Sequence, residues 1–198
     1  MLFRDRVMPA VFDLVMWPLD GLRARVVPEA RGRVLEVGSG TGLNFKHYGA
    51  VDELVTLDPD LASQPRAEQR GRGLPFQRRF EQGWAENLPH PDASFDTVVM
   101  TFVLCSVRDP ELALREARRV LRPGGVLLLA EHVRGTGMEA RLQDLAAPLW
   151  SHLAAGCQLN RATPQLLEGA GFTEIELGKP LHLLPLFPFV LGSARAGG

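Results

Sequence analysis

The chain has 198 residues, of which 45% are hydrophobic and 23% charged, and its formal net charge is −1 at pH 7. This composition is typical of a globular domain with a buried core, and the near-neutral charge argues against a nucleic-acid partner. We expect a cytoplasmic protein without a metal site, because the two cysteines make no disulfide framework, the five histidines show no metal-ligand spacing, and neither a secretory signal nor a membrane-spanning apolar run is evident.

The first thirty residues carry a helical stripe of apolar side chains that Pro9 and Pro18 interrupt. We therefore expect one or two short helices there. These helices could pack on the domain, form a lid over a ligand, or offer an interfacial face to a membrane.

A glycine-rich turn follows the apolar strand expected at Arg33–Val37. Gly38, Gly40 and Gly42 come at two-residue intervals, and such a turn lets a ligand approach the backbone closely. A helix is expected to begin at Thr41 or Gly42. Glu36 would repel a phosphate, so the turn favours S-adenosylmethionine (SAM) over NAD or ATP. A dinucleotide site and a purely structural turn remain alternatives.

Asp58 ends the next expected strand, Leu54–Leu57, about 20 residues after the first glycine. At that spacing a carboxylate can accept hydrogen bonds from both hydroxyls of a ribose. A helix cap or turn before Pro59 is the alternative interpretation.

The rest of the chain alternates between expected strands and helices. The strands are Phe76–Phe80, Phe95–Thr101, Val126–Ala130, Phe172–Leu177 and about Phe187–Ala194, and the helices are Leu61–Gly71, Pro110–Leu121, 138–155 and Thr163–Gly169, with Thr163 as N-cap. This alternation predicts an α/β fold with a doubly wound, mostly parallel sheet. Ligands bind beyond the carboxyl ends of such strands, where Glu36–Gly42, Asp58, Thr101 and Glu131–His132 would lie.

An ordered set of motifs resembles the class I SAM-dependent methyltransferases over residues 31–178. The motifs are VLEVGSGTG, LDPD, AENLPHPDASFD, LREARRVLRPGGVLLLAEH and LLEGAGF. GLNFKHY, TFVLCSVRDPE and W-x₆-C-x₂-N-R look like the methyltransferase-like thiol methyltransferases and their bacterial phospholipid N-methyltransferase-like relatives. The resemblance implies a seven-stranded Rossmann-like sheet whose last strand is antiparallel. It implies one domain over 1–198, with N-terminal lid helices (1–30), a cofactor-binding core (31–134) and acceptor-side helices with the final strand pair (135–198).

The resemblance also assigns cofactor contacts. Glu36, through water, and the turn Gly38, Ser39, Gly40 and Gly42 would hold the methionine end of SAM, which Thr101 would border. Asp58 would bind the ribose, and the residues expected around adenine are Pro59, Trp84, Ala85 and Glu86. Relatives often carry aspartate where this chain has Trp84, so either Glu86 replaces that acceptor or Trp84 covers the base.

On the acceptor side, His132 is the candidate general base, and a satisfied histidine at a strand end is its alternative. Asn160 and Arg161 could line the acceptor pocket or brace a loop. Phe12 stands in the lid where relatives often carry tyrosine, so a hydroxyl contact is lost there. Cys105 and Cys157 are interpreted as packing residues.

Three functions remain open on the sequence. The first is methyl transfer to a small-molecule thiol or another soft or lipophilic nucleophile. The second is a lipid or quinone methyltransferase that touches the membrane surface weakly through Val7–Leu22 and Leu181–Leu191. The third is an NAD-dependent dehydrogenase or nucleotide-binding domain. The oligomeric state is not indicated.

Overall fold

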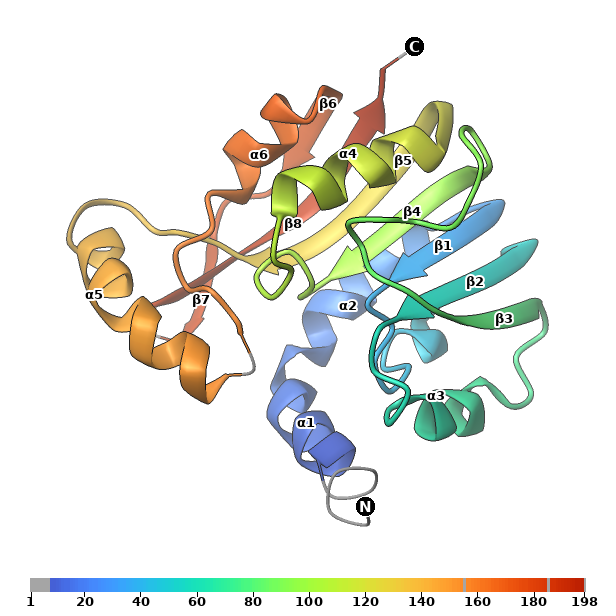
Figure 1. Cartoon of the computed structure of the whole chain (residues 1–198), viewed down its shortest axis with the longest axis horizontal. Helices are drawn as coiled ribbons and strands as arrows, with labels where there is room; N and C mark the ends of the chain where they lie inside the picture. The colour runs from blue at the N-terminus through green and yellow to red at the C-terminus, as the bar shows by residue number, and fades with distance from the viewer. Residues whose placement is uncertain (1–7, 155, 185, 198) are drawn as a thin grey trace.

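A computed structural model describes residues 8–154, 156–184 and 186–197. Its central sheet has the strand order β3-β2-β1-β4-β5-β8-β6, with β7 also paired to β8 (Figure 1). The strands are β1 (Arg33–Val37), β2 (Glu53–Asp58), β3 (Gln77–Gln82), β4 (Phe95–Thr101), β5 (Leu121–His132), β6 (Phe172–Leu177), β7 (Leu181–Leu184) and β8 (Phe187–Ala196). Strands β1 to β5 run parallel, and β8 is antiparallel to β5. The predicted α/β fold is confirmed.

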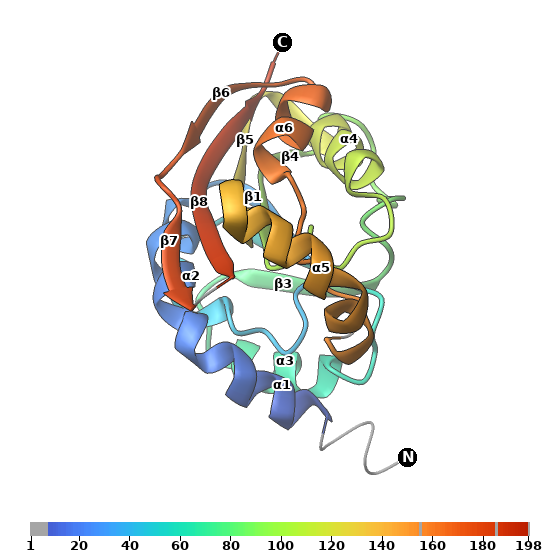
Figure 2. The same cartoon turned by 90° about the vertical axis from the view of Figure 1, so that its left-hand side faces the viewer.

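The sheet has eight strands where seven were expected. The extra strand arises because β6 and β7 pair with successive parts of β8 and are separated by residues 178–180. In Figure 2, β7 continues along β8 past the end of β6. The two short strands therefore share the place of one edge strand.

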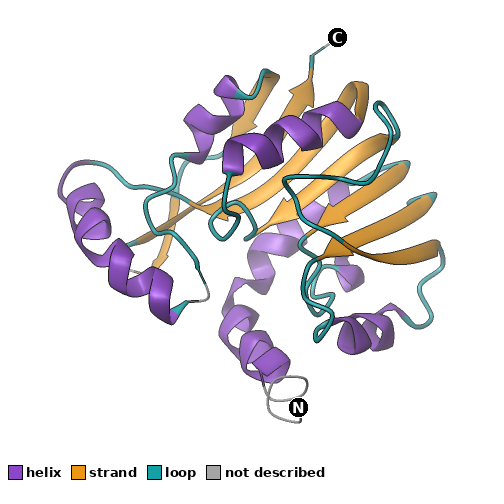
Figure 3. Ribbon diagram, viewed as in Figure 1, coloured by secondary structure: helices purple, strands orange, loops and turns teal. Residues whose placement is uncertain are grey.

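Helices cover both faces of the sheet (Figure 3). On one face, α4 (Pro110–Val120) and α6 (Thr163–Gly169) pack through Leu114 and Leu167 in one hydrophobic cluster. On the other face, α2 (Asp20–Val26) and α3 (Gln64–Gly71) belong to a second cluster. In β1, Leu35 joins the first cluster and Val34 the second, which explains why consecutive residues of a strand buried on both sides are apolar.

Two further helices, α1 (Met8–Met16) and α5 (Gly137–Leu153), lie beyond the carboxyl ends of the parallel strands (Figure 1). Within the described ranges, none of the helices combines the length and the apolar character that a membrane span requires. Pro18 lies in a short 3₁₀ turn, Trp17–Leu19, that separates α1 from α2. The prediction of short N-terminal helices is therefore confirmed for the described residues.

Some local predictions were wrong. No α-helix begins at Thr41 or Gly42, where a turn leads into a 3₁₀ helix at Phe45–His47. The reason is conformational, because Gly40 and Gly42 both have positive φ, which an α-helix does not accommodate.

Helix and strand ends also differ from the expectation. Thr163 is the first helical residue and not the cap, and its buried hydroxyl bonds to none of the residues that the structure describes. Strand β5 includes the Arg122–Gly125 turn, because its register against β4 shifts between Phe95 and Thr97. The extra residues bulge out of the ladder.

Gly192 in β8 provides a test of the sheet register. Its φ is +158°, and a Cβ added there would lie 1.9 Å from the carbonyl oxygen of Glu176 in β6. We expect Gly192→Ala to lower the free energy of unfolding by about 1–3 kcal/mol, measured by urea denaturation. Gly21→Ala is the matched control, since nothing lies within 4 Å of its added Cβ. Equal stability of the two variants would contradict the close approach of β6 to β8.

Candidate functional site

A cavity of about 440 Å³ opens beyond the carboxyl end of β1, where that strand lies between β2 and β4. This is the switch point of a doubly wound sheet, and the volume suits a small-molecule ligand. Ten predicted site residues line it: Phe12, Gly38, Ser39, Gly40, Asp58, Pro59, Trp84, Ala85, Glu86 and Thr101. Five others are not among its lining residues: Glu36, Gly42, His132, Asn160 and Arg161.

The glycines after β1 serve different purposes. A Cβ on Gly38 would lie 2.5 Å from Val103, and one on Gly42 would lie 2.7 Å from the ring of Phe45. Both positions are therefore restricted by the protein's own packing as well as by positive φ. Gly40 is different, because its added Cβ would meet only the ring of Phe12, 4.0 Å away. Gly40 is thus the point at which the backbone is open to a ligand.

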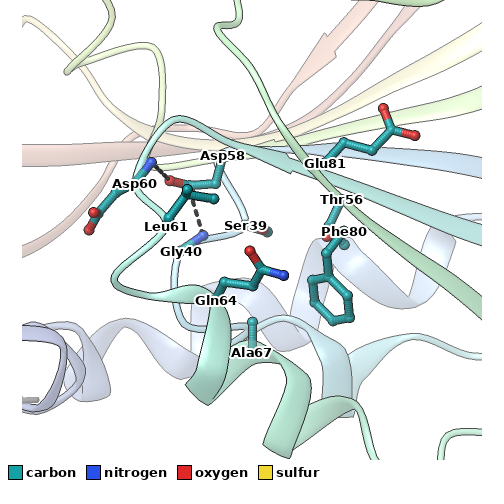
Figure 4. A pocket seen from close by; sticks show the side chains of 10 residues that line it. All are labelled: Ser39, Gly40, Thr56, Asp58, Asp60, Leu61, Gln64, Ala67, Phe80 and Glu81. Carbon is teal, nitrogen blue, oxygen red and sulfur yellow. Dashed lines mark hydrogen bonds between the residues drawn. The ribbon is translucent and has the colours of Figure 1, made fainter. Parts of the chain in front are cut away.

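Asp58 holds the glycine turn in place (Figure 4). Its carboxylate accepts hydrogen bonds from the backbone N–H of Gly40 at 2.7 Å and from that of Asp60 at 2.8 Å. Burial raises the pKa of this carboxyl group. The residues in Figure 4 line a small hollow that includes Asp58. Its volume is about 10 Å³, which leaves room for about one water molecule. The space for a larger ligand therefore lies in the main cavity, which Asp58 also lines.

Glu36 lies one layer behind the cavity. It is 1% exposed, and its carboxyl group accepts hydrogen bonds from the Tyr48 hydroxyl at 2.8 Å and the Asn44 amide at 3.0 Å. The same amide donates to the Thr101 hydroxyl at 3.0 Å. Burial raises the pKa of Glu36 to about 7. Asn44 and Thr101 line the cavity. Glu36 therefore orients the Asn44 amide, and through it the Thr101 hydroxyl, toward their positions in the cavity wall.

Arg23 is a lining residue that the sequence reasoning missed. It is 4% exposed, and its guanidinium carbon lies 4.6 Å from the centre of the Phe102 ring. Burial lowers its pKa to about 10, so the group is still charged at neutral pH. It forms no ion pair with any described residue. The sequence does hold a signal for Arg23, because a charged residue between Leu22 and Val26 lies on an apolar helix face and would be buried.

Asp13, also missed, ties α1 to the glycine turn. Its carboxylate pairs with Arg70 at 2.7 Å and with Arg66 at 3.3 Å, and it accepts a hydrogen bond from the Thr41 hydroxyl. Arg70 donates in turn to the Thr41 carbonyl at 2.7 Å. This network fixes Phe12, the neighbour of Asp13, at the cavity.

The loop between β3 and β4 contributes Trp84, Ala85 and Glu86 to the lining of the cavity. Trp84 is more than half exposed, and the Arg108 guanidinium lies 5.1 Å from its ring centre. Glu86 accepts hydrogen bonds from the N–H groups of Arg108, at 2.9 Å, and Asp109, at 3.3 Å. One carboxylate oxygen of Glu86 is therefore occupied by the start of α4.

The predicted acceptor residues lie elsewhere. Asn160 donates to Asp144 at 3.0 Å and Arg161 to the Val107 carbonyl at 2.9 Å, and both line a second hollow beside Arg108. Both thus brace loops in this structure.

His132 is buried at the end of β5, with Nε2 2.9 Å from Cys157 Sγ. Cys105 lies in the same group: the ligand atoms of the three side chains are within 4.8 Å of one another. Hydrogen bonding from Cys105, and then from His132, lowers the pKa of Cys157, while the pKa of Cys105 is raised.

Known proteins of similar sequence are methyltransferases. Residues 35–129 match the family model of a methyltransferase domain. Thiol S-methyltransferase TMT1B of Homo sapiens is 39% identical over 175 residues, covering 83% of this chain and 72% of the relative. Phosphatidylethanolamine N-methyltransferase of Cereibacter sphaeroides is 36% identical over 103 residues, covering 51% of each.

A solved methyltransferase structure has a similar fold. A SAM-dependent methyltransferase from Thermotoga maritima superposes with a TM-score of 0.72 at 26% identity, covering 99% of this chain and 100% of its own. None of these proteins is a dehydrogenase. The chain belongs to the SAM-dependent methyltransferases, in the group that includes the thiol S-methyltransferases, and S-adenosylmethionine is its cofactor.

Proposed function

We propose that the protein transfers the methyl group of SAM to the sulfur of a small-molecule thiol. The observation that carries the proposal is the 39% identity to a thiol S-methyltransferase over 83% of the chain. The cavity supports the proposal, because its lining includes polar groups that could bind the ribose and the methionine part of SAM.

The residues present fit SAM at both ends of the cavity. Asp58 uses one lone pair of each oxygen for backbone N–H groups and can accept the ribose hydroxyls with the others. Pro59, Trp84, Ala85 and Glu86 would surround the adenine. At the other end, Gly38, Ser39, Gly40 and Thr101 would border the methionine part, with Glu36 and Gly42 supporting them from behind.

Arg23 would hold the methionine carboxylate. A buried guanidinium without an ion-pair partner is unfavourable, and a ligand carboxylate would offset that cost. Asn44 also lines the cavity, and its amide oxygen could accept a hydrogen bond from the ammonium group of the methionine part. This pairing extends the cofactor site beyond the residues expected from the sequence.

Each segment of the chain would have its own role in binding. Residues 1–30 would act as a lid, because Phe12, Met16 and Arg23 all line the cavity from α1 and α2. Residues 31–134 would hold the cofactor, and 135–198 would flank the acceptor.

Bound SAM supplies a methyl group on a positively charged sulfur, so no further activation of the electrophile is needed. The chain's part is to align the acceptor sulfur with that methyl group and to exclude water, and alignment alone can be worth about 7–11 kcal/mol. Small thiols have a pKa of about 8.5 and are partly ionised at neutral pH. His132 bonds to Cys157 and lies outside the cavity lining, so this proposal needs no base at that position.

A crossed binding experiment tests the cofactor assignment. We expect Asp58→Asn to weaken binding of both S-adenosylhomocysteine and 5′-deoxy-5′-methylthioadenosine, because both contain the ribose. Arg23→Gln should weaken only S-adenosylhomocysteine, by about 10- to 100-fold, because methylthioadenosine lacks the carboxylate. Calorimetric titration measures both, and the matched controls are Asp92→Asn and Arg115→Gln on exposed ion pairs. Equal losses for both ligands in Arg23→Gln would remove Arg23 from the carboxylate site.

An acceptor screen with methyl-labelled SAM tests the substrate class. We expect label in small thiols and much less in quinols, phospholipids and amines. Across a series of thiols, the rate at fixed pH should rise with the fraction of thiolate, because the thiolate is the nucleophile. Label in a phospholipid or quinol but in no thiol would overturn the proposal.

A lipid or quinone acceptor is the second candidate, favoured by an exposed apolar stripe on α5. Its members, at helical spacing, are Met138, Leu142, Leu145, Leu149 and Leu153, and Leu145 is 81% exposed. In the C-terminal segment expected to contact lipid, Phe189, Val190 and Leu191 are buried in β8 and do not form an exposed apolar surface. We propose that weak membrane contact, if the acceptor is lipophilic, is made by α5 together with exposed residues of α1 such as Leu14.

Liposome flotation tests this contact. We expect weak, reversible association of the unaltered chain with phosphatidylcholine vesicles, and its loss in the Leu145→Gln/Leu149→Gln double variant. Leu112→Gln on α4 is the control, since Leu112 is an exposed leucine outside the stripe. Absence of flotation by the unaltered chain would count against a lipid acceptor.

A further inference from the structure

Three side chains with metal-binding atoms converge outside the cofactor cavity. Cys105 comes from the segment between β4 and α4, His132 is the last residue of β5, and Cys157 follows α5. Their ligand atoms all lie within 4.8 Å of one another, and Cys105 and Cys157 are the two cysteines of the chain.

The backbone holds these three segments together independently of the cluster. The N–H of Gln158 donates to the carbonyl of Cys105 at 2.8 Å. Glu131, next to His132, accepts hydrogen bonds from the N–H groups of Val103 at 2.7 Å and Leu104 at 3.0 Å. The three side chains are therefore brought together by a preformed frame, as a specific metal site requires.

The donor types are selective. Two thiols and one imidazole suit Zn²⁺ and other thiophilic cations, whereas Mg²⁺ and Ca²⁺ prefer oxygen ligands. No carboxylate belongs to the group within the part of the chain that the structure describes. Cys105 and His132 are buried and Cys157 is partly accessible, which leaves a way in for an ion.

The separations of the ligand atoms lie within about an ångström of those in a tetrahedral zinc centre. With Zn–S of about 2.3 Å and Zn–N of about 2.0–2.1 Å, ligand atoms at tetrahedral angles lie roughly 3.5–3.8 Å apart. The His132 Nε2 to Cys157 Sγ distance is 2.9 Å, so this pair would open by about half an ångström. Nε2 is the nitrogen of His132 directed at the cluster, and the buried Nδ1 bonds to no described residue.

We propose that Cys105, His132 and Cys157 form a binding site for a thiophilic divalent cation, with Zn²⁺ as the best match. The ion joins the segment after β4, whose residues Val103, Ser106 and Val107 line the cofactor cavity, to the segment after α5. On binding, each thiol loses its proton to solvent and becomes a thiolate ligand, and water completes the coordination.

Cobalt substitution tests the site directly. The full chain, treated with a chelator and kept reduced with a phosphine, is titrated with Co²⁺ and then with Zn²⁺. We expect thiolate-to-cobalt charge-transfer bands in the near ultraviolet, visible bands of tetrahedral cobalt, saturation at one ion per chain, and displacement by one equivalent of Zn²⁺. Absence of the charge-transfer bands would overturn the proposal, because the chain has no cysteines outside the cluster.

Matched variants locate the ligands. Cys105→Ser, Cys157→Ser and His132→Gln should each weaken Zn²⁺ binding by at least about tenfold. His182→Gln should leave it unchanged, since His182 is exposed and pairs with Glu139. Zinc affinity that survives all three cluster variants would contradict the assignment. A second outcome would also contradict the assignment. In it, a mild disulfide oxidant forms a reversible Cys105–Cys157 disulfide, and the chain takes up no metal after reduction.

The readout separates this inference from the proposed function. Metal content and cobalt spectra do not depend on methyl transfer, and S-adenosylhomocysteine binding is measured on the same samples. A chain that takes up one Zn²⁺ but methylates no thiol would refute the proposed substrate and leave the metal site intact.

Discussion

The site depends on one topological constraint, the position of β1 between β2 and β4. Because all three strands are parallel, their carboxyl ends meet at one edge, and the chain leaves β1 there through a turn that only glycine accommodates. Asp58 from β2 and Thr101 from β4 then face the same space from either side. A register slip of one residue in β2 or β4 would turn one of these side chains to the other face of the sheet.

Ionisable groups are buried around that edge at a cost in folding free energy. Glu36 has a pKa of about 7, the pKa of Asp58 is raised, and that of Arg23 falls to about 10, in each case chiefly through burial. Neutral partners satisfy the two carboxyl groups, whereas Arg23 forms no ion pair with a described residue. A ligand that supplies a carboxylate and hydroxyl groups offsets this cost, so cofactor binding is expected to stabilise the fold.

Much of the fold could be predicted because its signals are local. The apolar runs of β1, β4 and β5 mark strands, and their alternation with helices predicts a mostly parallel sheet. The position of Asp58 was predictable because it is the last residue of a strand, and the carboxyl ends of parallel strands lie at the ligand-binding edge of the sheet. The prediction of a helix beginning at Thr41 or Gly42 was wrong because Gly40 and Gly42 adopt positive φ, which an α-helix does not accommodate.

The positions of other residues depend on tertiary contacts that the sequence does not reveal. Arg23 and Asp13 lie in helices, and nothing local shows that these helices turn those side chains toward the glycine turn. Asn160 and Arg161 were expected near the acceptor but bond to Asp144 and Val107. The grouping of Cys105, His132 and Cys157 joins three distant segments, so no spacing rule for metal ligands could have found it.

The place of β8 has a consequence for biogenesis. This strand is late in sequence, yet it lies between β5 and β6, and β6 reaches the sheet only through it. On the ribosome, β1 to β5 can assemble while residues 187–196 are still inside the exit tunnel. Until residues 187–196 emerge and pair, the edge of β5 is unpaired and open to other nascent chains, so chaperone protection matters most during that interval.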